Sequence, residues 1–325
     1  MSERNTIYAR LPIFYGWVVI AVAFLTLAVA VNARTAFSLL FPPILDEFGW
    51  SRGVTAATLT VGFLASTAMS PVIGAMMDRF GPRVVIPLGA CVVALGFVAA
   101  TEISTPMGLY ATLGLLMVGG SISMSFIGHS MFLPNWFVRR RGLAIGIAFS
   151  GVGLGSITLL PLLQAIIDAD GWRAACMVLA GLILVTLIPL NAVFQRRRPE
   201  DLGLLPDGNG RGARELRPMT DTVVDRAWAE TDWTLRMASR TGRFWWIFGG
   251  YYCALFAWYS VQVHQTKYLV EAGFSAQSAA FALGLVGFSA LAGRSASARC
   301  LTASAASGRG AWRCWDSPAA TPRCC

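Results

Sequence analysis

The sequence predicts an all-α protein that crosses a membrane several times, and three observations support this fold class. Hydrophobic residues make up 55% of the 325 residues, charged residues make up only 13%, and the mean hydropathy is +0.59. Ordinary globular domains carry about 25% charged residues, so the deficit is large. Eight apolar runs follow one another, and each approaches or exceeds the roughly 20 residues that a helix needs to cross a bilayer.

We expect a membrane helix over each apolar run, because buried core helices do not recur eight times in succession with charged connections between them. The runs are residues 14–38, 54–77, 84–103, 107–137, 142–167, 173–195, 244–270 and 275–294. The first run is too long for a secretory signal peptide, since the uncharged stretch from Phe14 to Val31 continues as helix.

The runs divide the chain into four parts. Residues 1–195 form a six-helix bundle, 196–240 a hydrophilic cytoplasmic linker, 241–294 hold helices seven and eight, and 295–325 form a tail. The linker breaks regular structure with Pro and Gly in its first half, whereas Asp221 to Arg240 is expected to form a helix on the membrane surface. The tail lacks Val, Ile, Phe, Met and Tyr, which is typical of a shifted reading frame in a GC-rich gene. A genuine disordered or interfacial tail is the alternative.

The net charge of +9 comes almost entirely from arginine, and its distribution argues against nucleic acid as a partner. Arginines gather in alternate connections, namely before the first run and after the second, fourth and sixth. Positive residues in membrane proteins favour the cytoplasmic side. The sequence therefore predicts a multi-pass protein of the cell membrane, a bacterial inner membrane on this GC-rich composition, with a cytoplasmic N-terminus.

Enzymatic chemistry is not expected. The sequence contains no paired carboxylates or nucleophile–base arrangement at a useful spacing, no Walker loop, and no metal-ligand or cofactor motif. Cys91, Cys176 and Cys253 are isolated within apolar runs and are expected to be buried packing residues.

One connection carries a recognisable motif. Between the second and third runs the chain reads GAMMDRFGPR, with Gly74, Asp78, Arg79, Gly81 and Arg83 at the defining positions. This pattern resembles the gating motif of the major facilitator superfamily, in the cytoplasmic connection where that family has it. The resemblance implies that the aspartate faces the start of an eleventh helix. We expect that helix to be absent here, and we expect Asp78 either to cap a helix locally or to pair with local arginines.

Other segments resemble the monocarboxylate transporter-like branch of that superfamily, and most of all its bacterial oxalate/formate antiporters. They are Tyr15 to Trp17, Phe41 to Gly53, Trp136 to Gly151 and Arg198 to Gly208. The resemblance implies two six-helix bundles that rock around a central site. We therefore expect the N-terminal six-helix bundle plus the first two helices of the second, a C-terminal truncation after Arg294.

Charged and polar residues at membrane depth are the candidate binding residues, because each buried charge costs about 2.5–3.5 kcal/mol on insertion scales. Arg34, after Asn32, is either a cation facing the pore or a residue that reaches the outer headgroups. In the resembling family an arginine like Arg294 in helix eight holds the carboxylate. An arginine fork can hold a carboxylate through two hydrogen bonds.

Helix seven carries a polar cluster of Gln262, His264, Gln265 and Lys267. It either faces a cavity, where His264 and Gln265 would meet substrate and His264 would carry protons, or it forms hydrogen bonds between helices near the outer surface. Helix five carries two glycine pairs at four-residue spacing, which are expected to let helix backbones approach closely. These are Gly142 and Gly146, and Gly151 and Gly155.

The sequence thus supports a secondary transporter, a symporter or antiporter, for small organic anions such as mono- or dicarboxylates. Protons or a second anion would supply the energy, the lipid bilayer would surround the chain, and no protein partner is indicated. The alternative is a truncated, frameshifted fragment that transports nothing. A membrane sensor or scaffold that docks through residues 196–240 has little support, because nothing there resembles a signalling domain.

Overall fold

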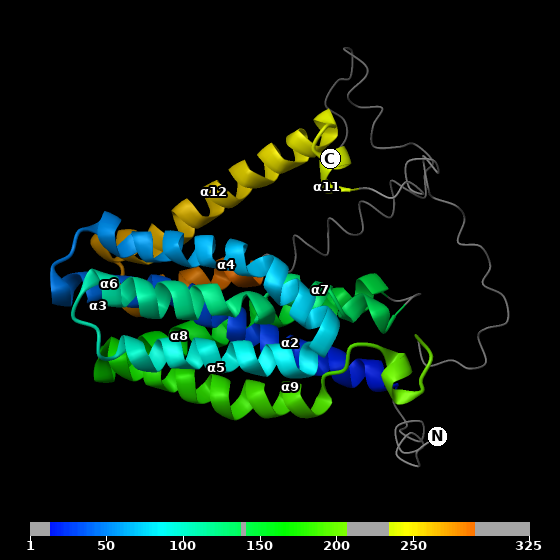
Figure 1. The fold of residues 1–325 in the computed structure, drawn as a ribbon. Helices are drawn as coiled ribbons and strands as arrows, with labels where there is room; N and C mark the ends of the chain where they lie inside the picture. The colour runs from blue at the N-terminus through cyan, green and yellow to red at the C-terminus, as the bar shows by residue number, and fades with distance from the viewer. Residues whose placement is uncertain (1–13, 138–140, 207–233, 290–325) are drawn as a thin grey trace, which may run out of the picture. The chain divides into compact units, whose positions relative to one another are not determined.

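The computed structural model describes residues 14–137, 141–206 and 234–289. The chain forms two compact units, of which the first comprises residues 1–210 with 255–289 and the second residues 211–254 with 290–325. Within the described ranges every regular element is helical and no strand is present (Figure 1). The predicted all-α class is confirmed.

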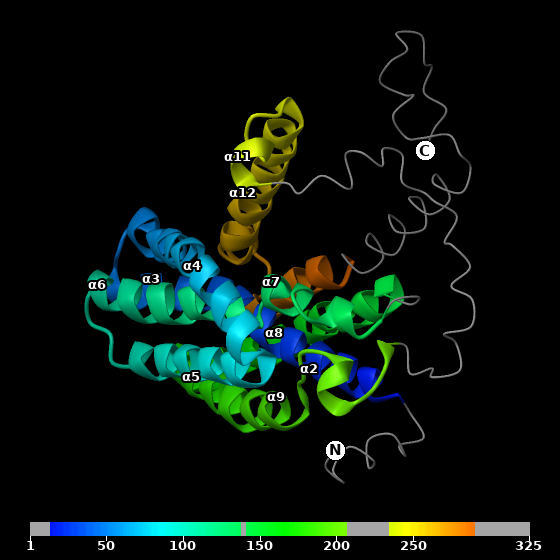
Figure 2. The same ribbon diagram turned by 45° about the vertical axis from the view of Figure 1, so that its right-hand side comes forward.

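The first unit is built from long helices that lie side by side (Figures 1 and 2). Their bounds are α2 Tyr15–Thr35, α3 Phe37–Phe48, α4 Arg52–Phe80, α5 Pro82–Ala100, α6 Pro106–Leu109, α7 Phe126–Ser130, α8 Arg141–Leu182 and α9 Ile188–Phe194. Short segments with tighter or wider helical turns continue or join them: η1 Tyr110–Gly119, η2 Ser121–Met124, η3 Leu133–Asn135, η4 Ile183–Leu187 and η5 Pro199–Leu202. Helix α12 (Gly242–Glu271) belongs to this unit from Leu255 onward, and a helix at Ala276–Ser289 follows.

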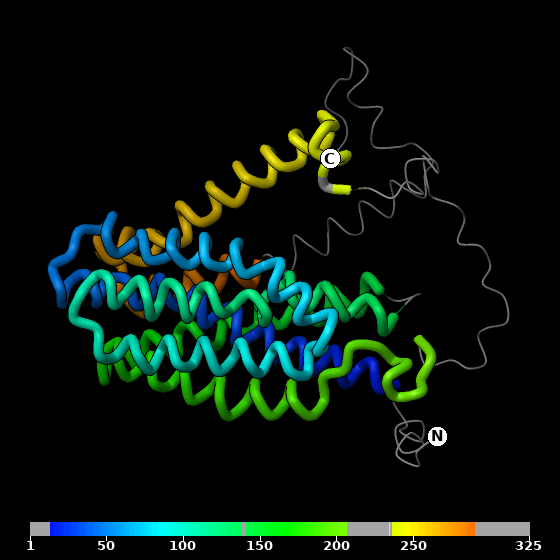
Figure 3. Tube along the Cα trace, viewed as in Figure 1, coloured from blue at the N-terminus to red at the C-terminus, as the bar shows by residue number. Residues whose placement is uncertain are grey.

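Within the described residues, five helices are long and apolar enough to cross a membrane, judged by length and composition. They are Tyr15–Phe48, Arg52–Phe80, Pro82–Ala100, Pro106–Asn135 and Arg141–Phe194. The last of them contains two predicted runs, because Gly171 adopts a positive φ of 84° and interrupts the helix between them. The first six predicted runs are therefore confirmed as helical, and the chain trace runs back and forth through them (Figure 3).

The last two predicted runs also form helices, but neither is among those five. Helix α12 is long enough, yet its many Trp and Tyr residues lower its mean hydropathy. The helix at Ala276–Ser289 is short within the described residues. In the second unit, the described residues are α11 (Leu235–Ala238) with the first half of α12. Most of the surface helix expected from Asp221 to Arg240 lies outside the described residues.

The first membrane helix is longer than the sequence predicted. Helix α3 continues almost directly from α2 and ends only at Phe48, where Gly49 adopts a positive φ of 63°. Pro42 and Pro43 lie inside α3, although proline lacks the N–H that a helix interior uses. At about 1.5 Å per residue, the helix runs about 20 Å beyond Arg34. Arg34 thus lies far from the helix end.

Helices α2 and α8 approach closely at two of the four predicted glycines. A Cβ added at Gly151 would lie 2.2 Å from the backbone oxygen of Phe24, and one at Gly155 would lie 2.3 Å from that of Ala28. The expected close contact is present there. For Gly142 and Gly146 a Cβ would meet nothing within 4 Å in the described chain, because these residues are exposed. The packing expected at this first pair is therefore not made within the described chain.

The outer faces of the first unit are apolar, as a lipid-covered surface requires. Exposed leucine, methionine and valine side chains follow α4, α5 and α8, among them Leu64, Val72, Leu95 and Leu162. Cys176 is buried as expected, whereas Cys91 lies exposed on such an outward face. Cys253, in the second unit, is also exposed, so the expectation of buried cysteines is wrong for both. An apolar run on a membrane helix does not distinguish the lipid-facing side from the protein-facing side.

Candidate functional site

The motif between α4 and α5 is held to the chain that follows α9. Arg197 donates one hydrogen bond to the Asp78 carboxylate at 2.9 Å and a second to the Asp78 backbone oxygen. Arg83 Nε donates to the backbone oxygen of Ala192 at 2.5 Å. Gly81 makes the turn with a positive φ of 74°. The partner of Asp78 is therefore an arginine 119 residues further along the chain, and not an arginine of its own connection as the sequence suggested.

The two other motif residues have smaller roles in this arrangement. Arg79 lies over the ring of Phe80 at 5.3 Å, and Gly74 faces the side chain of Met131. Trp136 Nε1 donates to the backbone oxygen of Arg196 at 3.1 Å, so Trp136 lies at the same end of the bundle as the segment after α9.

We expect Arg197→Ala to lower the apparent melting temperature of the detergent-solubilised protein more than Asp78→Asn does. The alanine variant loses both bonds to Asp78, whereas the asparagine variant keeps the bond to its backbone oxygen. The ion pair itself is partly exposed and contributes at most about 1 kcal/mol. Arg196→Ala is the matched control, because among the described residues the Arg196 side chain bonds only to the neighbouring backbone oxygens of Val193 and Gln195. A larger effect of Asp78→Asn would contradict this assignment.

At the opposite end of the bundle, Glu47 joins three helices. Its Oε2 accepts hydrogen bonds from Trp172 Nε1 and Arg173 Nη1, both at 2.7 Å. Arg173 Nε also donates to the backbone oxygen of Thr101 at 3.0 Å, and its guanidinium lies 4.4 Å from the Trp172 ring centre. The end of α3, the bend in α8 and the end of α5 are thereby fixed to one another.

Helix α3 is joined to α12 by a row of contacts, here named the α3–α12 seam. The seam consists of Ser38 with Gln262, Phe41 with His264, and Asp46 with Lys267. Residue numbers increase together along the two helices, so they run in the same direction. The first and seventh helices are therefore parallel neighbours within this unit.

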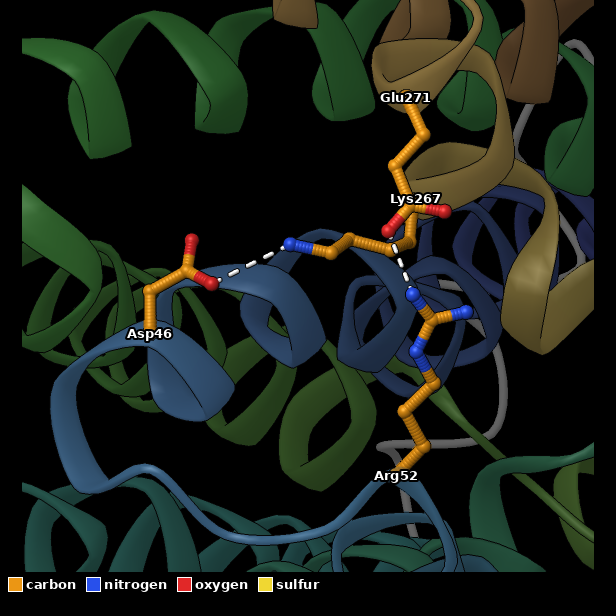
Figure 4. A network of polar contacts seen from close by, with 4 residues as sticks. All are labelled: Asp46, Arg52, Lys267 and Glu271. Atoms are coloured by element: carbon orange, nitrogen blue, oxygen red, sulfur yellow. Dashed lines mark hydrogen bonds and ion pairs between the residues drawn. The ribbon is translucent and has the colours of Figure 1, made fainter.

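Two ion pairs close the outer end of the seam (Figure 4). Lys267 Nζ lies 3.2 Å from Asp46 Oδ1, and Arg52 Nη2 lies 2.5 Å from Glu271 Oε1. Figure 4 shows Lys267 and Glu271 reaching from the end of α12 toward the end of α3 and the start of α4. Opposite charges thus hold the end of α12 against the first helices.

We expect the charge reversal Lys267→Asp to lower the melting temperature slightly and the double reversal with Asp46→Lys to restore it. Exposed pairs contribute about 0.2–1 kcal/mol, and the Asp46 side chain is 69% exposed. A double-mutant cycle measures this coupling directly. The pair Arg52 and Glu271, reversed in the same way, serves as a second cycle. Additive effects of the two single changes would show that Asp46 and Lys267 do not interact.

Arg34 lies on α2, just before the seam begins at Ser38, and it contacts residues of α4 and α12. Its Nη2 donates to the hydroxyl of Tyr259 on α12 at 3.2 Å. Its guanidinium lies 5.7 Å from the ring centre of Phe63 on α4, and the Phe63 and Tyr259 rings are 4.8 Å apart. All three side chains are half-buried. No acidic side chain among the described residues pairs with Arg34.

The other predicted binding residues lie in different surroundings. Asn32 is buried, and its Nδ2 donates to the backbone oxygen of Ala28 within α2 at 2.7 Å and to that of Val152 on α8 at 3.0 Å. Both of its N–H groups are thus used, and one of them joins α2 to α8. His264 is exposed and meets the Phe41 ring edge-on at 5.8 Å, whereas Gln265 is half-buried. Arg294 lies outside the described residues.

Sequence reasoning missed three residues, one beside the motif and two beside Arg34. Arg197 could not be assigned as the partner of Asp78, because the two residues come from segments that are distant in the sequence. Phe63 and Tyr259 are aromatic residues in runs rich in apolar residues, where packing is the default interpretation. For Tyr259 the helical spacing was a usable signal, because it places Tyr259 on one helical face with Val263 and Thr266. In the structure Val263 and Thr266 are both buried.

Comparison with known proteins identifies the family. The family model described as Major Facilitator Superfamily matches residues 23–310, beyond Arg294, where the resemblance was expected to end. Monocarboxylate transporter 11 from Homo sapiens is 36% identical over 180 residues, which is 55% of this chain and 38% of that protein. Monocarboxylate transporter 13 from Rattus norvegicus is 28% identical over 290 residues, covering 87% of this chain and 60% of the relative.

An oxalate:formate antiporter from Oxalobacter formigenes is 30% identical over 181 residues, which is 55% of this chain and 42% of that protein. The chain thus spans between about two fifths and three fifths of the length of these relatives. The family match covers well over half of the chain and agrees with the motif around Asp78. The chain belongs to the major facilitator superfamily, with monocarboxylate transporters and an oxalate:formate antiporter among its relatives.

Proposed function

We propose that this chain is a secondary active transporter that moves small organic anions, such as mono- or dicarboxylates, by alternating access. The observation that carries the proposal is Arg34, a half-buried arginine at membrane depth without an acidic partner among the described residues. A charge in such a place is costly and is usually retained for a ligand or a conducted ion. The names of the relatives, monocarboxylate transporters and an oxalate:formate antiporter, agree with an anion.

The surroundings of Arg34 favour a carboxylate over a cation or a neutral solute. The guanidinium carries a positive charge and offers several N–H donors. Tyr259 uses one of these donors. The others are left to meet an anionic oxygen, and charge-assisted bonds of this kind are about twice as strong as neutral ones.

The proposal also assigns roles to residues of the seventh and eighth helices. His264 and Gln265 are proposed to line the route beside the seam, with His264 as a proton carrier if a proton gradient drives transport; exchange against a second anion is the other energy source. Arg294 is proposed as a second carboxylate ligand on the strength of the family resemblance. The arginines in alternate connections of the sequence support a cytoplasmic N-terminus, and the GC-rich composition supports the inner membrane of a bacterium.

Uptake into proteoliposomes tests the proposal. The purified 325-residue chain is reconstituted, and entry of radiolabelled oxalate, lactate and pyruvate is measured with and without an internal carboxylate or an imposed proton gradient. We expect saturable uptake that unlabelled carboxylates inhibit, whereas lactamide, a neutral analogue of lactate, does not.

Phosphate and sulfate are included as competitors because they are anions with tetrahedral geometry. If these ions inhibit uptake as strongly as carboxylates do, the substrate class is oxyanions in general and not carboxylates in particular. Absence of saturable uptake of every anion, in liposomes that contain correctly folded protein, would overturn the proposed function.

A further inference from the structure

The hydroxyl of Tyr259 has one hydrogen-bonding role still open. In its contact with Arg34 the Tyr259 oxygen accepts a proton, because a guanidinium can only donate. The phenolic proton itself is therefore not used in that bond. No acceptor for it is present among the described residues, so the hydroxyl remains available as a donor beside the guanidinium.

A carboxylate has two oxygens, and the paired donors match them. One oxygen can take an N–H of Arg34 while the other takes the O–H of Tyr259, since the two donor groups already touch at 3.2 Å. Phe63 supports both groups, with its ring 5.7 Å from the guanidinium carbon and 4.8 Å from the Tyr259 ring. The aromatic pair limits the positions that either donor can take.

The competing interpretation is that Tyr259 only fills space between α4 and α12. Its ring contact with Phe63 is compatible with that role. The two interpretations differ in what the hydroxyl does, because a packing role needs the ring alone. Removal of the hydroxyl with retention of the ring therefore separates them.

We propose that Tyr259 is a second ligand of the substrate carboxylate, together with Arg34. This inference rests on the proposed function and adds a contact to it. Arg34 comes from the first helix and Tyr259 from the seventh, so one bound anion would touch both parallel helices. Substrate binding would then directly stabilise the approach of α12 to α2 at the base of the α3–α12 seam.

The test compares equilibrium binding of radiolabelled oxalate to the wild-type chain and to Tyr259→Phe. We expect the dissociation constant to rise about tenfold or more, because hydrogen bonds to charged groups have effects of that size. The melting temperature without ligand should be unchanged, because the contact with Phe63 is kept. Tyr251→Phe is the matched control, since Tyr251 lies on the same helix and is 67% exposed.

The outcomes distinguish the two proposals. Oxalate binding by the wild-type chain with an equal dissociation constant for Tyr259→Phe would overturn the role of Tyr259 and leave the proposed function intact. A folded wild-type chain that binds no carboxylate would overturn the proposed function and this inference together. A raised dissociation constant for Tyr259→Phe, with Tyr251→Phe unchanged, would support both.

Discussion

Gly151→Leu and Gly155→Leu are each expected to disrupt the packing of α2 against α8 and to lower the melting temperature markedly. An added Cβ would lie within 2.3 Å of a backbone oxygen on α2, a distance that only separation of the helices can relieve. At Gly155 the same Cβ would also lie 2.6 Å from Asn32 Nδ2, which bonds α8. Overpacking of this kind costs about 1–3 kcal/mol, and a rigid backbone obstacle places the cost at the upper end. Size-exclusion profile and melting temperature are the measurements.

Gly142→Leu and Gly146→Leu are the matched controls. They have the same spacing on the same helix, but a Cβ there meets nothing within 4 Å. Leucine also favours helix more than glycine does, by roughly 0.5–1 kcal/mol. We therefore expect these variants to be as stable as the wild type or slightly more stable. Equal damage from all four substitutions would contradict the assignment of the α2–α8 contact to Gly151 and Gly155.

Arg34→Gln is expected to raise the apparent KM for carboxylate uptake by about 10- to 100-fold. Glutamine keeps N–H donors but is shorter and loses the charge, and charged hydrogen bonds of about 1.5–3 kcal/mol correspond to a change of this size. Arg34→Lys should recover part of the activity, because lysine restores the charge without the planar fork.

Arg52→Gln provides the comparison for the Arg34 variants. Arg52 is also an arginine at the first helices, but it pairs with Glu271 at the outer end and its side chain is 58% exposed. We expect the apparent KM of the Arg52→Gln variant to stay within a few-fold of the wild-type value. An Arg34→Gln variant with unchanged KM, or an equal loss in Arg52→Gln, would mean that the site does not depend on Arg34.

The helices were largely predictable, since apolar runs of about 20 residues have few other solutions. The length of the first helix was not predictable. Pro42 and Pro43 favour a helix end near them, whereas in the structure the helix continues to Phe48 and ends at Gly49. That difference changes the interpretation of Arg34. A residue near a helix end reaches the headgroups, whereas Arg34 lies about 20 Å from the end and contacts Tyr259 instead.

The candidate site was only partly predictable, because its partners come from distant segments. The charge of Arg34 within an apolar run identified it as a candidate, but the sequence did not show which side chains it contacts. The motif residue Asp78 was expected to meet an arginine, and contact with Arg197 depends on how α9 returns to α4 and α5. Phe63 and Tyr259 could not be separated from ordinary packing residues, since aromatic side chains fill both roles.

The most direct test of the account is the effect of oxalate on the melting temperature of the wild-type chain and of Arg34→Gln. A ligand at 100 times its dissociation constant stabilises the folded state by about 2.7 kcal/mol, which shifts the melting temperature by several degrees. We predict that oxalate produces this shift in the wild type, that lactamide produces none, and that Arg34→Gln does not respond. An equal oxalate-induced shift in the wild type and in Arg34→Gln would contradict a carboxylate site at Arg34.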